Sequence, residues 1–178
     1  MRIYLILIST LLITPAIASA RLGEYQKDNQ ARYGNAVKEN FTVSPLLRSA
    51  LNEAYHYQGW KIQVGYMNGR AVRIAYSKLP QKNVSPQLKD DEIAAVLEAE
   101  SHGGQWKQLK PASLFSVKNS GNKTFDHAQL RWSNNNKCIA YCPLGRMIVY
   151  IESPEAVMWE QSIENEKEVK RKENIPRF

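Results

Sequence analysis

Cysteine is scarce in this chain, whose 178 residues include only Cys138 and Cys142. Two cysteines form at most one internal bridge, which excludes a disulfide-dense scaffold. The length also excludes a large enzyme with separate cofactor and substrate domains. In one extended strand the two Cα atoms would be about 13 Å apart, whereas a disulfide needs about 7 Å or less. A turn here would therefore allow a disulfide, and a continuous strand predicts two buried free thiols.

The chain lacks an apolar run long enough to span a bilayer, which takes roughly 20 residues. The run over 3–13 is shorter and contains hydroxyl side chains. Arg2, this run and the small residues 16–20 follow the order of a secretory signal. We therefore predict a signal peptide that is cleaved after Ala20, and a mature chain without a transmembrane segment that is periplasmic or extracellular. No cysteine follows the cleavage site, so the lipid attachment point of bacterial lipoproteins is missing.

The motifs of common enzyme classes are also missing. The sequence has no phosphate loop, dinucleotide fingerprint, nucleophile elbow or Cys-x-x-Cys pair. Its histidines, His56, His102 and His127, match no zinc-protease spacing. We therefore expect no metal and no cofactor. The alternative is a small periplasmic hydrolase, which predicts that His102 or His127 lies in a pocket beside an Asp or Glu.

Acidic residues are fewer than basic ones. The chain has 24 Lys and Arg against 17 Asp and Glu, a charge of +7, which falls to +6 once the single Arg of the signal peptide is removed. This balance attracts anionic surfaces without specifying one. We expect a protein or an anionic envelope component as partner, and no nucleic acid, because an aromatic-basic motif is lacking.

A β-hairpin is the clearest pattern that is present. Alternating runs over 60–67 and 70–76 flank Asn68-Gly69, the preferred two-residue turn, because both turn positions need a positive φ. A further strand over 53–57 and a helix over 24–33, closed by Gly34, complete this unit. The predicted core side chains are Leu22, Tyr25, Tyr33, Trp60, Ile62, Val64, Tyr66, Val72, Ile74 and Tyr76.

A second unit of the same kind follows. An acidic first turn over 90–92, with apolar residues at helical spacing after it, predicts a helix. Strands are predicted over 128–132, 137–142 and 146–152. The fold class is therefore α+β, with two helix-plus-antiparallel-meander units that suggest a distant duplication. The predicted segments are a signal peptide over 1–20, units over 21–78 and 79–153, and a C-terminal helix with a charged tail over 154–178.

Two features are candidates for binding. Aromatic residues crowd the first hairpin, where they either form a core face or bind a partner when exposed. We predict Tyr55 and Tyr57 as the exposed pair, and Arg70 and Arg73 as their basic neighbours. The second feature is the charged tail, which either is solvated or adheres to an anionic surface.

The sequence Ala31-Arg32-Tyr33-Gly34-Asn35-Ala36-Val37 ends the first helix and precedes an antiparallel meander. This arrangement resembles the small exported bacterial modules of the outer-membrane assembly lipoprotein (SmpA/OmlA) and beta-lactamase-inhibitor-like type, over 22–78 and again over 90–152. The chain is also similar to exported proteins of environmental bacteria. The resemblance implies a non-enzymatic protein-interaction module and transfers no site residues. Our leading hypothesis is thus an exported, non-catalytic binding or interaction protein of the cell envelope.

Overall fold

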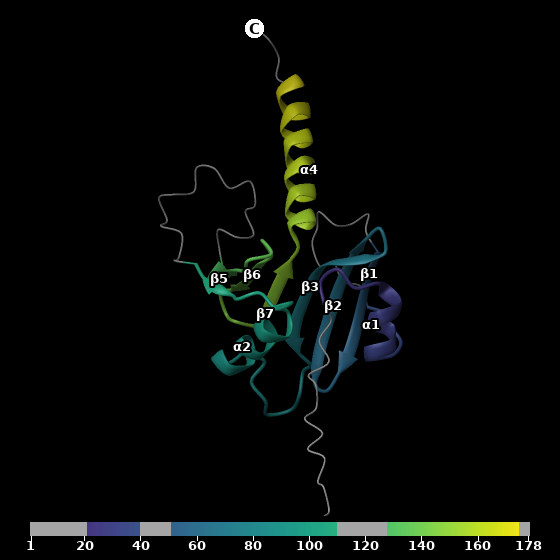
Figure 1. Ribbon diagram of the computed structural model, residues 1–178, viewed down its shortest axis with the longest axis vertical. Coiled ribbons are helices and arrows are strands. Elements are labelled where there is room, and N and C mark those ends of the chain that lie inside the picture. Colours follow the sequence, from purple (N-terminus) through teal and green to yellow (C-terminus); the bar gives the residue numbers. More distant parts are fainter. Residues whose placement is uncertain (1–20, 40–50, 110–127, 175–178) are drawn as a thin grey trace, which may run out of the picture.

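The computed structural model describes residues 21–39, 51–109 and 128–174, which form an α+β structure around one antiparallel sheet of seven strands (Figure 1). The strand order is β1-β2-β3-β7-β6-β5-β4. The strands are β1 (Leu51–Tyr57), β2 (Trp60–Met67), β3 (Arg70–Lys78), β4 (Lys107–Gln108), β5 (Ala128–Ser133), β6 (Ile139–Pro143) and β7 (Ile148–Glu152). The described helices are α1 (Gln26–Tyr33), α2 (Asp90–Ala99) and α4 (Pro154–Glu173).

The predicted hairpin is confirmed, with one change of register. Asn68 and Gly69 have φ angles of 51° and 75°, the left-handed conformation that a tight two-residue turn requires. The pairing of β2 with β3 shifts just before Tyr66, which therefore lies opposite Ala71. As a result Ala71 joins the buried apolar cluster. Val72, which we predicted in the core, is buried as well.

The two predicted units share one continuous sheet. Their last strands, β3 and β7, pair antiparallel at its centre, where Ile74 lies opposite Ile151. Both side chains are fully buried. The pairing of β3 with β7 is therefore part of the core.

Helices α1 and α2 pack on the same face of the sheet. Tyr33 of α1 and Leu97 of α2 belong to one buried apolar cluster with Ile62, Ile74 and Ile151 of the strands. The acidic first turn of α2 is present as predicted. We call this side of the sheet the covered face.

The opposite side, which we call the open face, carries the side chains that alternate with those of the covered face. Among the described helices, α4 lies against it with its first turns, where Glu160 contacts Arg73. Beyond these turns α4 rises away from the sheet (Figure 1). The open face comprises His56, Lys61, Gln63, Arg73, Ala75, Arg131, Tyr141, Tyr150 and Glu152.

The start of α4 is confirmed in detail. The hydroxyl of Ser153 accepts a hydrogen bond from the backbone N–H of Ala156 at 3.3 Å, and Pro154 occupies the first turn. Within the described ranges, none of the helices has the length and apolar character to cross a bilayer. The predicted signal peptide, its cleavage after Ala20 and a short strand expected near 41–43 lie outside the described residues.

Candidate functional site

Tyr55 is buried, so the exposure that we predicted for it is wrong. Its side chain lies beneath α1, with its ring 5.5 Å from that of Tyr33 between centroids. Its hydroxyl donates to the carboxylate of Glu53 and lies 3.2 Å from the hydroxyl of Tyr66. Burial first, and then these contacts, raise the pKa of the Tyr55 phenol. The alternation of side chains along β1 does not show which face of the sheet is buried. The structure shows that α1 packs on the face that carries Tyr55.

Tyr57 and Arg70 are accessible but already engaged. Tyr57 is half-buried against Tyr33, at 5.3 Å between ring centroids. The exposed guanidinium of Arg70 lies 4.2 Å from the ring centroid of Tyr25 and donates to the carbonyl of Gly23 at 3.0 Å. These contacts tie the segment before α1 to the hairpin. They also explain why Tyr25 is 44% exposed, where we had predicted a core contact.

Arg73 points to the open face and is only 2% exposed, so the surface position that we predicted for it is wrong. It contacts Glu152, its cross-strand partner on β7, and lies 2.8 Å from a carboxylate oxygen of Glu160. Burial raises the pKa of Glu152, against the opposing effect of the Arg73 charge. The three groups form an enclosed ionic cluster that anchors α4. Arg73 is therefore not part of an exposed binding surface, because the start of α4 covers it.

A second buried centre lies on the covered face, around Glu100. Its carboxylate accepts hydrogen bonds from the hydroxyl of Tyr76 at 2.6 Å and from the backbone N–H of Leu22 at 3.3 Å. The Nε2 atom of His102, whose side chain is 28% exposed, lies 3.7 Å from the same carboxylate. Burial raises the pKa of Glu100 although these neighbours oppose the shift. His102 is thus beside a carboxylate, which is one part of what the hydrolase alternative predicts. His127 lies outside the described residues.

The cysteines are both free and buried. Cys142 lies in β6, and Cys138 comes just before it, where its backbone N–H donates to the side chain of Asn134 at 3.0 Å. Burial raises the pKa of both thiols. The free-thiol alternative therefore describes this structure, and neither thiol is activated as a nucleophile.

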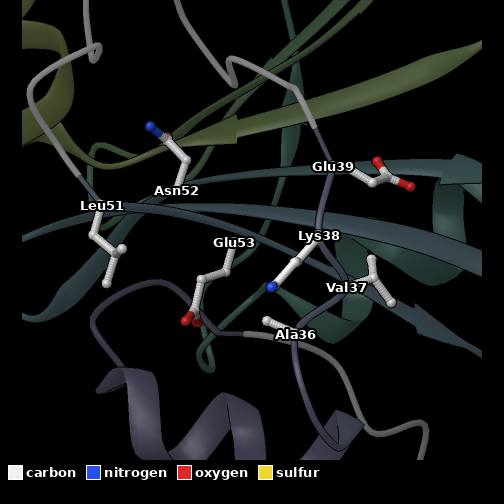
Figure 2. Close-up of a pocket in the computed structure, with 7 residues that line it drawn as sticks. All are labelled: Ala36, Val37, Lys38, Glu39, Leu51, Asn52 and Glu53. Carbon is white, nitrogen blue, oxygen red and sulfur yellow. The ribbon is translucent and has the colours of Figure 1, made fainter.

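One surface hollow, of about 420 Å³, lies at the outer edge of β1, where Val37 pairs with Ala54 (Figure 2). Its two carboxylates, Glu39 and Glu53, point in different directions (Figure 2). Each has partners of its own, because Glu39 pairs with Lys61 and Glu53 accepts from Gln26 at 2.5 Å. Two carboxylates so separated do not act as an acid and base on one bond. The hollow is lined by Ala36, Val37, Lys38, Glu39, Leu51, Asn52 and Glu53.

A second hollowed region lies between α2 and the edge strands β4 and β5. Two adjoining hollows there share Leu97, Gln108 and Trp132, and together we call them the α2 groove. Trp106 also lines it. The sequence predicted that Trp132 lies in a strand. It gave no signal that Trp106 and Trp132 are neighbours, because strand pairing brings them together.

The described residues contain no cluster of three or more His, Cys, Asp or Glu that could hold a metal ion. Comparison with known proteins adds no functional residue to these centres. No family model, no curated protein and no solved structure matches the chain.

Proposed function

We propose that the chain is an exported, non-catalytic binding protein of the cell envelope, and that a protein partner docks on the open face of its sheet. Export is supported by the signal peptide that the sequence predicts over 1–20. A binding role is supported by the shape of the sheet and by the side chains on its open face.

The observation that carries this proposal is the contrast between the two faces. Both α1 and α2 pack on one face, whereas the other presents a row of side chains that crosses five strands. In this row Gln63, Tyr150 and Arg131 are half-exposed, and the buried side chains of Ala75 and Tyr141 lie between them. The rings of Tyr141 and Tyr150 stack at 5.0 Å between centroids. Tyrosine and arginine are the side chains that most often dominate protein interfaces.

The charge of this face favours a partner with an acidic surface. His56, Lys61 and Arg131 are exposed or half-exposed on it. The acidic side chains Glu152 and Glu160 are buried. Glu39 is half-exposed and pairs with His56 and Lys61, so Arg131 is the side chain that would offer its positive charge to a partner. Since the mature chain is also basic overall, charge complementarity would speed the encounter with such a partner.

The test compares two variants with the same change of charge. Residues 21–178 are immobilised and exposed to envelope extract, with washes at low and high salt. We expect one specific protein to be retained, and Arg131→Glu to weaken its purified complex by about tenfold or more. Lys82→Glu is the control, because Lys82 is exposed in the segment between β3 and α2, away from the open face. Equal retention by both variants, or only salt-labile material, would contradict the proposal.

We also propose that the chain arose by duplication of one helix-plus-meander unit. The arrangement supports this, because α1 precedes β1 to β3, α2 precedes β5 to β7, and the last strands pair in the middle. It also supports kinship of each half with the SmpA/OmlA and inhibitor-like modules, which implies protein interaction. A sequence profile of 22–78 built from relatives of this chain should match 90–152. Failure to match would argue against duplication.

A second candidate function rests on the proximity of His102 to Glu100. In a small hydrolase the imidazole would act as general base and the buried carboxylate would orient it. The measurement is a screen of ester and peptide substrates with the mature chain and with His102→Ala. Hydrolysis that this substitution leaves unchanged would exclude the assignment.

A further inference from the structure

The α2 groove runs beside α2 over the edge of the sheet that is farthest from β1. Its two hollows have volumes of about 570 and 400 Å³ and overlap at Ala94, Leu97, Gln108 and Trp132. Sites for small ligands typically measure about 300 to 1,000 Å³. The groove is thus large enough for a small ligand, and it shares no residue with the open face.

Two tryptophans form an aromatic lining that is fixed before any ligand binds. The indole N–H of Trp106 donates to the backbone carbonyl of Leu97 at 2.6 Å, which sets the orientation of its ring against α2. Trp132 lies opposite Ala140 on β6, a small and fully buried residue, so its position is set by the sheet. Both indoles are half-buried and pack on the core.

The rim of the groove is polar and carries no positive charge. Gln105, Gln108 and Glu98 are exposed along it, and they supply amide donors, amide acceptors and a carboxylate. Asp90 at one end is engaged by Arg146. None of the residues that line the two hollows, all of them described, is Lys or Arg, although the chain is basic. An anionic ligand would therefore meet no cationic side chain among these lining residues.

We propose that the α2 groove binds a neutral saccharide. The C–H groups of a sugar ring carry partial positive charge and pack on the electron-rich face of an indole. Its hydroxyls both donate and accept, as do the side-chain amides of Gln105 and Gln108. The tryptophans would thus pack on the apolar face of the sugar ring, and the amides and Glu98 would bind its hydroxyls. Because no Lys or Arg lines the groove, phosphorylated or acidic ligands are disfavoured.

The experiment titrates the mature chain, 21–178, with cellotetraose, maltotetraose, xylotetraose and N-acetylchitotetraose. Binding is followed by isothermal titration and by tryptophan fluorescence. We expect saturable binding of at least one of them, with a change in fluorescence. Ala94→Arg, which places a long side chain across both hollows from an exposed helix position, should weaken binding by about tenfold or more.

A matched control comes from the other helix. Ala31 is exposed on α1, so Ala31→Arg makes the same substitution away from the groove and should leave saccharide binding unchanged. Circular dichroism of both variants checks that the fold is retained. Gln108→Ala offers a second variant that removes an exposed amide without adding bulk.

Three outcomes would overturn the proposal. They are no saturable binding of any of these saccharides, binding that Ala94→Arg leaves intact, and tighter binding of tetralysine, which would identify a groove for cationic peptides. None of these outcomes affects partner capture on the open face, which Arg131→Glu tests separately.

Discussion

The two faces of the sheet bury carboxylates in different ways. On the covered face Glu100 is held by a tyrosine hydroxyl and a backbone N–H, with only the half-exposed His102 as a potential cation. On the open face Glu152 and Glu160 share the guanidinium of Arg73. The first centre relies on hydrogen bonds to neutral groups, and the second relies on charge.

This difference predicts different responses to mutation and to pH. A carboxyl group among neutral donors keeps hydrogen-bond partners when it takes up a proton. Two carboxylates around one cation leave an uncompensated buried charge as soon as that cation is removed. The open-face cluster should therefore be the more fragile of the two.

The largest effect is expected from Arg73→Met. This change leaves two carboxylates buried without their cation and should lower the free energy of unfolding by about 3–5 kcal/mol at neutral pH. Urea denaturation measures it. Lys61→Met on the same face removes a partly exposed ion pair with Glu39 and should cost less than about 1 kcal/mol. Equal losses in the two variants would refute the ionic anchoring of α4.

Tyr76→Phe probes the covered face. It removes the hydroxyl that donates to Glu100 and should cost about 1–3 kcal/mol, because the carboxylate is left with fewer donors inside the core. Tyr57→Phe is the control, since the hydroxyl of Tyr57 accepts a hydrogen bond from the exposed side chain of Gln58 and contacts no buried carboxylate among the described residues. If the two variants lose the same stability, the hydroxyl of Tyr76 has no special part in this centre.

A third variant, Glu100→Gln, tests how the stability of the covered-face centre depends on pH. Burial raises the pKa of Glu100 above its ordinary value of 4.5, so the folded chain binds this proton more readily than the unfolded chain. The resulting stability is complete below 4.5 and is lost as the pH rises through the pKa of the folded state. Glu100→Gln removes the titrating group, so its free energy of unfolding should fall less than that of the wild type from mildly acidic to neutral pH. Parallel curves would show that Glu100 does not titrate in this range.

The smallest effect is expected at the surface, where neither face is involved. Arg70→Gln removes the cation above the ring of Tyr25 and should cost about 0.5–1 kcal/mol, because the contact is exposed. Thermal unfolding at low and high salt measures this baseline. A loss as large as that of Arg73→Met would mean that the segment before α1 is a structural anchor.

Local patterns predicted most of the elements. Asn68-Gly69 specified the hairpin turn, the acidic residues of 90–92 specified the start of α2, and Ser153-Pro154 specified the start of α4. Each of these signals acts within a few residues along the chain. Such features can be recognised without any knowledge of the neighbours in space.

The features that failed depend on contacts between distant segments. Tyr55 and Arg73 are buried because α1 and α4 pack over them. Ala71 joins the core because β2 and β3 shift their register. The α2 groove could not be predicted from the sequence either, because strand pairing brings Trp132 to the side of α2. Sequence periodicity predicts that a side chain alternates, but it does not predict which helix will cover it.

The outer part of α4 has a mechanical consequence. Ala156 and Glu160 are buried, whereas every described residue from Asn165 onward is exposed, including Glu168, which pairs with Arg171. At about 1.5 Å per residue, the helix from there to Glu173 makes a rigid stalk roughly 14 Å long. A bead or sensor surface joined beyond that residue would be held away from both proposed binding surfaces, so attachment at this end leaves the open face and the α2 groove accessible together.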